Sequence, residues 1–538
     1  MLTVHRILVS DKLGNAGIEL LEAADDVEFD VRTGLSEAEL IEAISEYDGL
    51  IIRSGTTVTE SILEAATKLK VVGRAGVGID NVDVRAATRN GVIVLNTPSA
   101  NTIATAEHAM ALMLSASRNL ALAHAAMADG RWERSNYTGT ELYGKTLAVL
   151  GFGRIGQRVT ERAQAFGMRV LAYDPFVPES VARDANVELL DLDDVLAAGD
   201  YFTLHMSMTD ETRGIINEEN IAKMKPTAII VNAARGGLVD EAAVASALDE
   251  GKLGAFATDV YSSEPPPPEN PLVGHPRVTH TPHLGASTEE AQRDVALQVV
   301  SQVMAAVRGE DVADSINVAG SGGDENELVS PFVTLAEKIG RLQMAMADGA
   351  IASVEVEVIS PNAESLIRPV AAGLLKGLLD SVVAGRVNFV NAPLLAEERG
   401  IKISRSVSVG GGDYQHMLSC RVRWASNDSG EPDQERVISG AVFGQRLPRI
   451  VQISTYAFEA DPNGTVLLML NNDVPGVIGE VGSVFGEYGV NIAEWRLGRD
   501  DERNEALSFI NLDSQPNSEV LAALRDLPAV TKASIVEL

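Results

Sequence analysis

Short β-branched apolar runs alternate with amphipathic segments in two successive parts of the chain. In the first part, residues 6–98, the apolar runs are RILVS, VEFDVR, GLIIRS, KVVGRAG and VIVLNTP. In the second part the same rhythm begins with KTLAVL at residues 145–150 and continues through RVLAYD, DYFTLH, TAIIVNAA and GAFATDV. Strands that alternate with helices form parallel sheets with helices on both faces. The pattern therefore predicts two doubly wound α/β domains in series.

The rest of the sequence predicts two further domains, because single cores seldom grow beyond about 250–300 residues and this chain has 538. A Gly-rich, acidic stretch near residues 320–327 is the predicted linker. A mixed α+β region follows it, and the chain then ends in a strand–helix–strand–strand–helix–strand order that is typical of a ferredoxin-like domain. A periodic helix after residue 284 is expected to cross back and cover the first domain. The expected boundaries are 1–100 with 285–318, 101–284, 328–460 and 463–538.

A glycine-rich turn, GFGRIG at residues 151–156, stands between a predicted strand and a predicted helix. Its first glycine permits a tight bend, its second lets the backbone approach a pyrophosphate, and its third lets the helix pack closely on the sheet. The helix N-terminus then directs free N–H groups at the phosphates. An aspartate after the next strand has the spacing of a carboxylate that binds ribose hydroxyls and favours NAD over NADP. The predicted NAD-binding residues here are Gly151, Gly153, Arg154, Ile155, Gly156 and Asp174.

Three polar residues follow successive strands of the same predicted domain. Arg235 comes after AIIVNAA, Glu264 after FATDVYSSE and His283 after VTHTP. Ligands bind at the carboxyl ends of the strands in a doubly wound sheet, so these side chains can converge on one cleft. An imidazole can take a hydroxyl proton, a carboxylate can orient the ring, and a guanidinium can grip a substrate carboxylate. The set favours hydride transfer, although a surface arginine, a loop acid and a helix cap are the structural alternatives.

Several segments taken together resemble a known family. GRAGVGIDNVD, GTELYGKTLAVLGFGRIG, VNAARGGLVDE, ATDVYSSEPP and PHLGAST are similar to segments of the NAD-dependent D-2-hydroxyacid dehydrogenases, and among them of the long-form phosphoglycerate dehydrogenases. The resemblance spans essentially the whole chain. It implies a flavodoxin-like substrate domain, a Rossmann NAD domain, an intervening domain and a C-terminal ACT domain. The implied reaction is the NAD-dependent oxidation of D-3-phosphoglycerate to 3-phosphohydroxypyruvate, the first step towards L-serine.

The resemblance also implies a role for each residue of the predicted cleft. His283 would be the acid/base, Glu264 its partner and Arg235 the group that binds the substrate carboxylate. Ala233 and Asp259 would lie beside the cofactor, with Asp259 at the nicotinamide end.

Three further arginines match positions that contact the substrate phosphate in the family. They are Arg53, Arg74 and Arg134, and Ser54 and Asn96 are expected to be neutral neighbours of the substrate. Guanidinium is the preferred fork for phosphate, and surface arginines at strand ends are the structural alternative. In the family Arg134 is offered by the neighbouring subunit, which implies a homodimer or a homotetramer.

The last 75 or so residues resemble an ACT domain, a small module that senses amino acids. By this resemblance Asn471, Asp473 and Asn491 would contact an effector, with L-serine as the expected ligand. The alternative is a dimerisation module without a ligand. The stretch VQISTYAFEADPNG, where some relatives are thought to bind a second anionic effector, contains no His, Lys or Arg. A second effector site is therefore doubtful.

Composition excludes several other classes of function. Acidic residues outnumber basic ones by 76 to 44, so the surface should repel nucleic acid and anionic membranes. The only cysteine, Cys420, excludes an intrachain disulfide and a Cys-based zinc site, and His280 with His283 lacks the partners of a metal centre. No apolar run approaches about 18–20 residues. We therefore expect a cytoplasmic protein without a metal, a nucleic-acid partner or a membrane span.

Three other functions are open at this point. A reductase of hydroxypyruvate or glyoxylate would use the same chemistry, but Arg53, Arg74 and Arg134 argue against a substrate without phosphate. An NAD-sensing corepressor would not need the full set of Arg235, Glu264 and His283. An amino-acid sensor with vestigial catalysis would bind serine without turnover.

Overall fold

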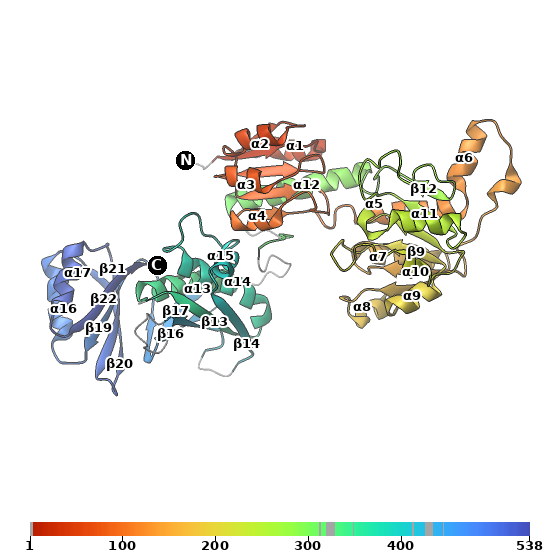
Figure 1. Ribbon diagram of the computed structural model, residues 1–538. Coiled ribbons are helices and arrows are strands. Elements are labelled where there is room, and N and C mark those ends of the chain that lie inside the picture. The colour runs from red at the N-terminus through yellow and green to blue at the C-terminus, as the bar shows by residue number, and fades with distance from the viewer. Residues whose placement is uncertain are drawn as a thin grey trace.

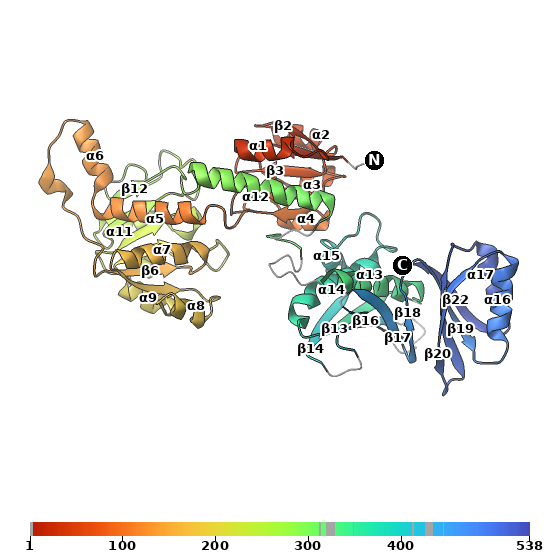
Figure 2. The ribbon, with the colours of Figure 1, turned by 180° about the vertical axis from the view of Figure 1, so that it is seen from behind.

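The structure, a computed structural model, describes residues 4–310, 314–318, 329–347, 349–410, 414–425, 434–444 and 446–538. Its strands form four sheets, shown from two sides in Figures 1 and 2. The fold class predicted from the sequence is confirmed: two doubly wound α/β domains precede an α+β domain and a ferredoxin-like domain. The predicted linker near 320–327 lies outside the described residues.

The first sheet is parallel and has the flavodoxin-like strand order β2-β1-β3-β4-β5. Helix α12 returns from far along the chain and packs against α1, β3 and β4 (Figure 2). Its Val299 and Val303 are fully buried beside Ile7 and Val71. The elements are β1 (His5–Val9), α1 (Asn15–Glu22), β2 (Val27–Val31), α2 (Glu37–Ile44), β3 (Gly49–Ile52), α3 (Glu60–Ala65), β4 (Val71–Arg74), α4 (Val84–Arg89), β5 (Ile93–Leu95) and α12 (Glu289–Arg308).

The second sheet is also parallel, with the order β12-β11-β10-β9-β6-β7-β8. The strand order reverses between β6 and β9, so a crevice is expected at their carboxyl ends, where such sheets bind ligands. The elements are α5 (Thr102–Ser117), β6 (Thr146–Leu150), α7 (Arg154–Ala165), β7 (Arg169–Tyr173), α8 (Glu179–Asp184), β8 (Glu188–Leu189), α9 (Leu192–Ala198), β9 (Tyr201–Leu204), α10 (Glu218–Ile221), β10 (Ile229–Asn232), η2 (Gly236–Leu238), α11 (Glu241–Asp249), β11 (Ala255–Thr258) and β12 (Val278–His280).

An arm of the second domain projects away from both sheets (Figures 1 and 2). It consists of α6 (Leu120–Ala128) and the short helix η1 (Arg134–Tyr137). Leu120, Met127 and Trp132 are exposed on it, Trp132 by 75%. Large apolar side chains gathered on one projection mark a contact surface more often than a free one.

The third sheet has the order β14-β13-β15-β16-β17-β18, with one parallel pair, β13 and β14. Helices α13 and α14 pack against each other and on this sheet. The elements are α13 (Val329–Ala345), β13 (Ile351–Ile359), α14 (Ala363–Leu379), α15 (Ala392–Glu398), β14 (Lys402–Ser408), β15 (Met417–Trp424), β16 (Gln434–Phe443), β17 (Leu447–Ile453) and β18 (Tyr456–Ala460). At its edge this domain touches the first one: the Arg89 Nη2–Glu398 Oε1 distance is 3.0 Å, and Asn388 Nδ2 donates to Gly91 O at 2.7 Å.

The fourth sheet has the order β20-β21-β19-β22 and the predicted strand–helix–strand–strand–helix–strand sequence. One face carries α16 and α17, and Leu468 and Phe509 on the other face share a core with the third domain. The elements are β19 (Thr465–Asn472), α16 (Val477–Glu487), β20 (Ile492–Asp500), β21 (Glu505–Leu512), α17 (Ser518–Arg525) and β22 (Val530–Glu537). In the described part of the chain, none of the helices has the length and hydropathy needed to cross a bilayer.

Candidate active site

The glycine turn has the backbone geometry that its sequence predicts. Gly151 has a φ of 96°, and a Cβ there would lie 2.6 Å from the Met206 backbone nitrogen. A Cβ on Gly156 would lie 2.3 Å from Gly151 O, whereas no atom lies within 4 Å of the Cβ position of Gly153 at the start of α7. The first and third glycines are therefore required by the close approach of the chain. The second faces open space at a helix N-terminus, where a phosphate can approach.

Asp174 lies against the glycine turn. It follows β7, its Oδ2 accepts a hydrogen bond from Phe152 N and its Oδ1 one from Phe176 N, both at 2.9 Å. These bonds hold the carboxylate against the glycine turn and leave a further lone pair on each oxygen for a ligand. Arg154 and Ile155 open α7, and Ala233 is buried after β10.

His283 and Glu264 form a hydrogen-bonded pair. The distance from His283 Nδ1 to Glu264 Oε2 is 2.6 Å, and Glu264 Oε1 accepts from Tyr261 N at 3.0 Å. Among the described residues, no hydrogen bond involves His283 Nε2, and 51% of the side chain is exposed. The carboxylate thus fixes the ring through one nitrogen and leaves the other free for proton transfer.

Asp259 is buried, with 1% exposure, beneath the loop that carries His283. Its Oδ1 accepts from Leu284 N at 2.7 Å and its Oδ2 from Gly285 N at 2.8 Å. Burial alone would raise the pKa of Asp259, but hydrogen bonds from His108, Thr281 and Leu284 outweigh it and lower the pKa. Asp259 is therefore an ionised anchor of this loop, with both oxygens engaged by protein donors.

Arg235 reaches from the second domain to the first. Its Nε donates to Asp80 Oδ2 at 3.0 Å and its Nη1 to Ala234 O at 2.7 Å. A Cβ on Gly78 would lie 1.7 Å from Arg235 Nη2, so only glycine leaves room for the guanidinium. Two donors are thus occupied, and the Nη1–Nη2 edge keeps the free donors that match a carboxylate.

Arg74 and Arg53 add positive charge at the same place. Burial is the main cause that lowers the pKa of the Arg74 guanidinium to about 10; the charges of Arg235 and Arg53 add to it, and those of Asp80 and Asp11 partly offset it. The Arg74 Nε is buried and has no hydrogen-bond partner among the described residues. A partly buried guanidinium carries a desolvation cost that an anionic ligand offsets. The excess of positive charge in this cluster favours the approach of a small anion.

The segment that carries Arg235 is a neighbour of the segment that carries Glu264. A Cβ on Gly236, the residue after Arg235, would lie 1.9 Å from the Tyr261 carbonyl carbon, and Tyr261 N holds Glu264. The structure therefore brings the predicted carboxylate binder beside the His283–Glu264 pair.

The neutral substrate residues and Arg134 have different placements. Asn96 is buried and donates from Nδ2 to Val77 O at 2.6 Å, while Ser54 is exposed directly after Arg53. Arg134 is exposed on η1, whose contacts are with α6 in the projecting arm. Within one chain the structure does not bring Arg134 to the arginine cluster.

Comparison with known proteins finds family models that match three parts of the chain. Residues 110–285 match the family model "D-isomer specific 2-hydroxyacid dehydrogenase, NAD binding domain", residues 328–454 the "D-3-phosphoglycerate dehydrogenase intervening domain" and residues 465–529 the ACT domain. The D-3-phosphoglycerate dehydrogenase of Methanocaldococcus jannaschii is 41% identical over 99% of this chain and 100% of its own length. The chain belongs to the D-3-phosphoglycerate dehydrogenase family. The resemblance seen in the sequence and the NAD cofactor are thereby confirmed.

Two further similar proteins differ in how much of the chain they match. The D-3-phosphoglycerate dehydrogenase of a Synechocystis species is 40% identical over 100% of this chain and 95% of its own length. A glyoxylate reductase structure from Paecilomyes thermophila is 31% identical, with a TM-score of 0.54, and covers 59% of this chain and 99% of its own. The D-3-phosphoglycerate dehydrogenase relatives extend over the whole chain, whereas the reductase leaves about two fifths of it unmatched.

The ACT domain does not bring its three predicted effector residues together within one chain. Asn471 and Asp473 lie at the end of β19, where Asp473 Oδ2 is 3.3 Å from Arg499 Nε. Asn491 precedes β20 at the opposite end of the sheet and donates to Asp513 Oδ2 at 2.6 Å. Since a strand rises about 3.4 Å per residue, the 8 residues of β21 separate these positions by roughly 24 Å.

Two residues of the site were not predicted. Asp80, the partner of Arg235, stands inside the segment GRAGVGIDNVD, which resembles the family. The sequence therefore marked this segment, but it did not reveal that Asp80 contacts Arg235. His108, which contacts Asp259 from α5, stands in a helical segment without any local signal.

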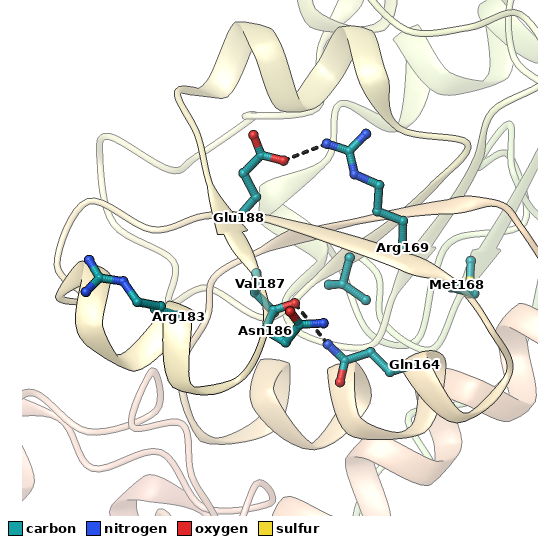
Figure 3. A pocket seen from close by; sticks show the side chains of 8 residues that line it. Gln164, Met168, Arg169, Arg183, Asn186, Val187 and Glu188 are labelled. Atoms are coloured by element: carbon teal, nitrogen blue, oxygen red, sulfur yellow. Dashed lines mark hydrogen bonds and ion pairs between the residues drawn. The ribbon is translucent and has the colours of Figure 1, made fainter.

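Figure 3 shows a pocket in the second domain. It adjoins Arg169, the first residue of β7, whereas Asp174 follows the last one. Arg169 is paired with Glu188 at 2.6 Å, and 77% of the Arg183 side chain is exposed. Because one arginine is paired and the other is solvated, neither charge needs a ligand to compensate it. In the described part of the chain, no group of three or more His, Cys, Asp or Glu side chains is arranged to hold a metal ion.

Proposed function

We propose that this chain oxidises D-3-phosphoglycerate to 3-phosphohydroxypyruvate with NAD, the first step of L-serine biosynthesis. The observation that carries the proposal is the cluster of Arg53, Arg74 and Arg235 beside the His283–Glu264 pair. A substrate with a carboxylate, a 2-hydroxyl and a phosphate uses all of these groups. The relatives that extend over the whole chain bear this activity in their names.

Each side chain has a distinct part in this reaction. His283 Nε2 takes the proton of the 2-hydroxyl, and Glu264 stabilises the imidazolium that forms. The free Nη1–Nη2 edge of Arg235 binds the carboxylate, and Arg53 and Arg74 bind the phosphate. Bound NAD supplies the hydride acceptor. The residues of the glycine turn and Asp174 would hold its pyrophosphate and ribose, for which the open side of Gly153 leaves room.

The main test compares substrates that differ in one group. NADH formation is followed by absorbance with D-3-phosphoglycerate, D-glycerate and 2-hydroxyglutarate. We expect D-3-phosphoglycerate to react with a kcat/KM about a thousandfold or more above that of D-glycerate, since the phosphate adds at least two charge-assisted bonds of about 1.5–3 kcal/mol each. Equal rates with D-glycerate would contradict the proposal and favour a reductase of a non-phosphorylated acid. No turnover in either direction would favour an NAD-sensing corepressor.

The choice of NAD over NADP gives a prediction for Asp174. Asp174→Ala is expected to lower the preference for NAD over NADP by about tenfold to a hundredfold, because a ribose contact is lost and repulsion of the 2′-phosphate is removed. The ratio of kcat/KM for the two cofactors measures it. Asp184→Ala removes an exposed aspartate at the end of α8 and should leave the ratio unchanged. An unchanged ratio in the Asp174 variant would contradict the assignment.

L-serine is the proposed effector and the ACT domain its site. Asn471 Oδ1 is buried without a hydrogen-bond partner among the described residues, and Asp473 can bind an amino group. Because Asn491 lies at the far end of the sheet, one serine can contact all three residues only if a second copy supplies Asn491. This geometry, together with the exposed apolar arm that carries Arg134, supports a homodimer or a homotetramer.

The effector proposal predicts a selective loss of regulation. Asp473→Ala is expected to raise the serine concentration for half-inhibition by about tenfold or more, since a charged hydrogen bond is lost. The ratio of initial rates with and without serine measures it, and Glu519→Gln on α17 is the control. If serine leaves the wild-type rate unchanged, the ACT domain is a dimerisation module without this ligand.

The expected domain boundaries belong to the same proposal: 1–100 with 285–318 for substrate, 101–284 for NAD, 328–460 for the intervening domain and 463–538 for the ACT domain. A cytoplasmic location also belongs to it.

A further inference from the structure

Helix α5 presents two polar side chains to the loop that carries His283. Thr105 Oγ1 donates to Gly285 O at 3.2 Å, and one turn later His108 Nε2 lies 3.1 Å from Asp259 Oδ1 and 3.0 Å from Thr281 Oγ1. Residues three apart on a helix share one face, so both reach the same loop. Neither touches the predicted substrate groups.

The tautomer of His108 follows from its partners. Asp259 has a lowered pKa and is ionised, so its oxygens only accept hydrogen bonds. Thr281 Oγ1 donates its proton to Asp259 Oδ1 at 2.6 Å. His108 Nε2 must therefore carry a proton, which it donates towards both oxygens. The imidazole is 19% exposed, and it completes the set of donors around Asp259.

The loop above this network is held in an uncommon backbone conformation. His283 has a φ of 55°, in the left-handed region that residues other than glycine seldom adopt. Its own N–H donates to Asp259 O at 2.9 Å, and the next two N–H groups donate to the Asp259 carboxylate. A conformation of this kind persists only where the surroundings over-determine it. The α5–Asp259 network supplies that restraint.

We propose that His108, assisted by Thr105, is a positioning residue for catalysis: through Asp259 it holds the backbone of His283 so that Nδ1 meets Glu264. This inference rests on the proposed function of His283 as the base. Helix α5 follows β5 of the first domain, with Asn96 between them. The residues that hold the His283 loop therefore lie on the element that joins the two domains. A small displacement of a reacting group costs about a hundredfold in rate.

The test distinguishes the effect of the hydrogen-bond donor of His108 from the effect of its size. His108→Leu removes the donor, and His108→Gln keeps an N–H of similar reach. We expect kcat to fall about tenfold to a hundredfold in the leucine variant while KM for substrate and for NAD stays within about threefold, because orientation and not binding is lost. The glutamine variant should recover at least about a third of wild-type kcat. As a control, thermal unfolding is measured for both variants and should show that each of them is folded.

A second measurement does not depend on turnover. Hydrogen exchange of the Leu284 and Gly285 amides should be faster in His108→Leu and near wild type in His108→Gln. Wild-type kcat in the leucine variant, equal losses in both variants, a parallel rise of KM or unchanged exchange would each overturn the proposal. If the wild-type protein does not turn over D-3-phosphoglycerate, the proposed function fails, and hydrogen exchange still decides whether His108 holds the loop.

Discussion

Replacement of His283 by glutamine is expected to lower kcat with D-3-phosphoglycerate by about 10²–10⁴-fold, the usual share of a positioned acid/base. The reason is the free Nε2, since Nδ1 is held by Glu264 at 2.6 Å and only Nε2 can accept the hydroxyl proton. A glutamine has similar size but no basic nitrogen. The affinity for NADH, measured by fluorescence titration, should stay within about threefold, because the change removes chemistry and not a cofactor contact.

Two further variants serve as comparisons for His283→Gln. Glu264→Gln should give a smaller loss in kcat, since the ring keeps a hydrogen-bond partner but loses the charge that stabilises the imidazolium. His275→Gln changes a histidine that pairs with Asp249 at 3.3 Å outside the site and should keep wild-type kcat. A His283→Gln variant with more than about a tenth of wild-type kcat would show that another group takes the proton.

Replacement of Arg74 by methionine is expected to move activity and stability in different directions. The kcat/KM for D-3-phosphoglycerate should fall about 10²–10³-fold, since a buried anion partner is worth about 3–5 kcal/mol when one side is removed. The value for D-glycerate should fall far less. The free energy of unfolding should stay unchanged or rise, because burial and the charges of Arg235 and Arg53 already disfavour the charged guanidinium in the folded protein.

Steady-state kinetics with both substrates and chemical denaturation check the Arg74 prediction. Arg85→Met, an exposed arginine on α4 of the same domain, is the control for loss of charge alone. Equal losses with D-3-phosphoglycerate and D-glycerate would remove Arg74 from the phosphate site. A large fall in stability would mean that the guanidinium has a structural partner instead.

The residues at strand ends show why part of the site was predictable. Arg235, Glu264 and His283 could be assigned to one cleft because parallel strands share an edge for their carboxyl ends, and the alternation of strands and helices is readable in one dimension. The glycine turn was predictable for a similar reason. The close contact of Gly156 with Gly151 O arises within six residues of sequence, whereas the contact of Gly151 with Met206 N comes from a segment far along the chain.

The ACT residues and Arg134 show where such reasoning stops. The resemblance assigned Asn471, Asp473 and Asn491 to one effector, but the register of β20 on β21 places Asn491 at the far end of the sheet. Arg134 lies on η1, which packs on α6 in the projecting arm. One chain does not bring these residues together, and a sequence motif carries no sign of which residues meet in space.

The amino-acid sequence by itself determined the two parallel sheets, the turn for the dinucleotide and the types of residue at the strand ends, because hydrophobic period and glycine sterics are local properties of the chain. The tertiary structure alone decided the contacts that give those residues their state. Asp80 meets Arg235 across 155 positions of sequence, and His108 meets Asp259 across 151. Burial and pairing are set by whichever distant segments pack against a group, so the lowered pKa of Arg74 and the hydrogen bonds that hold the loop of His283 appear only in the folded chain.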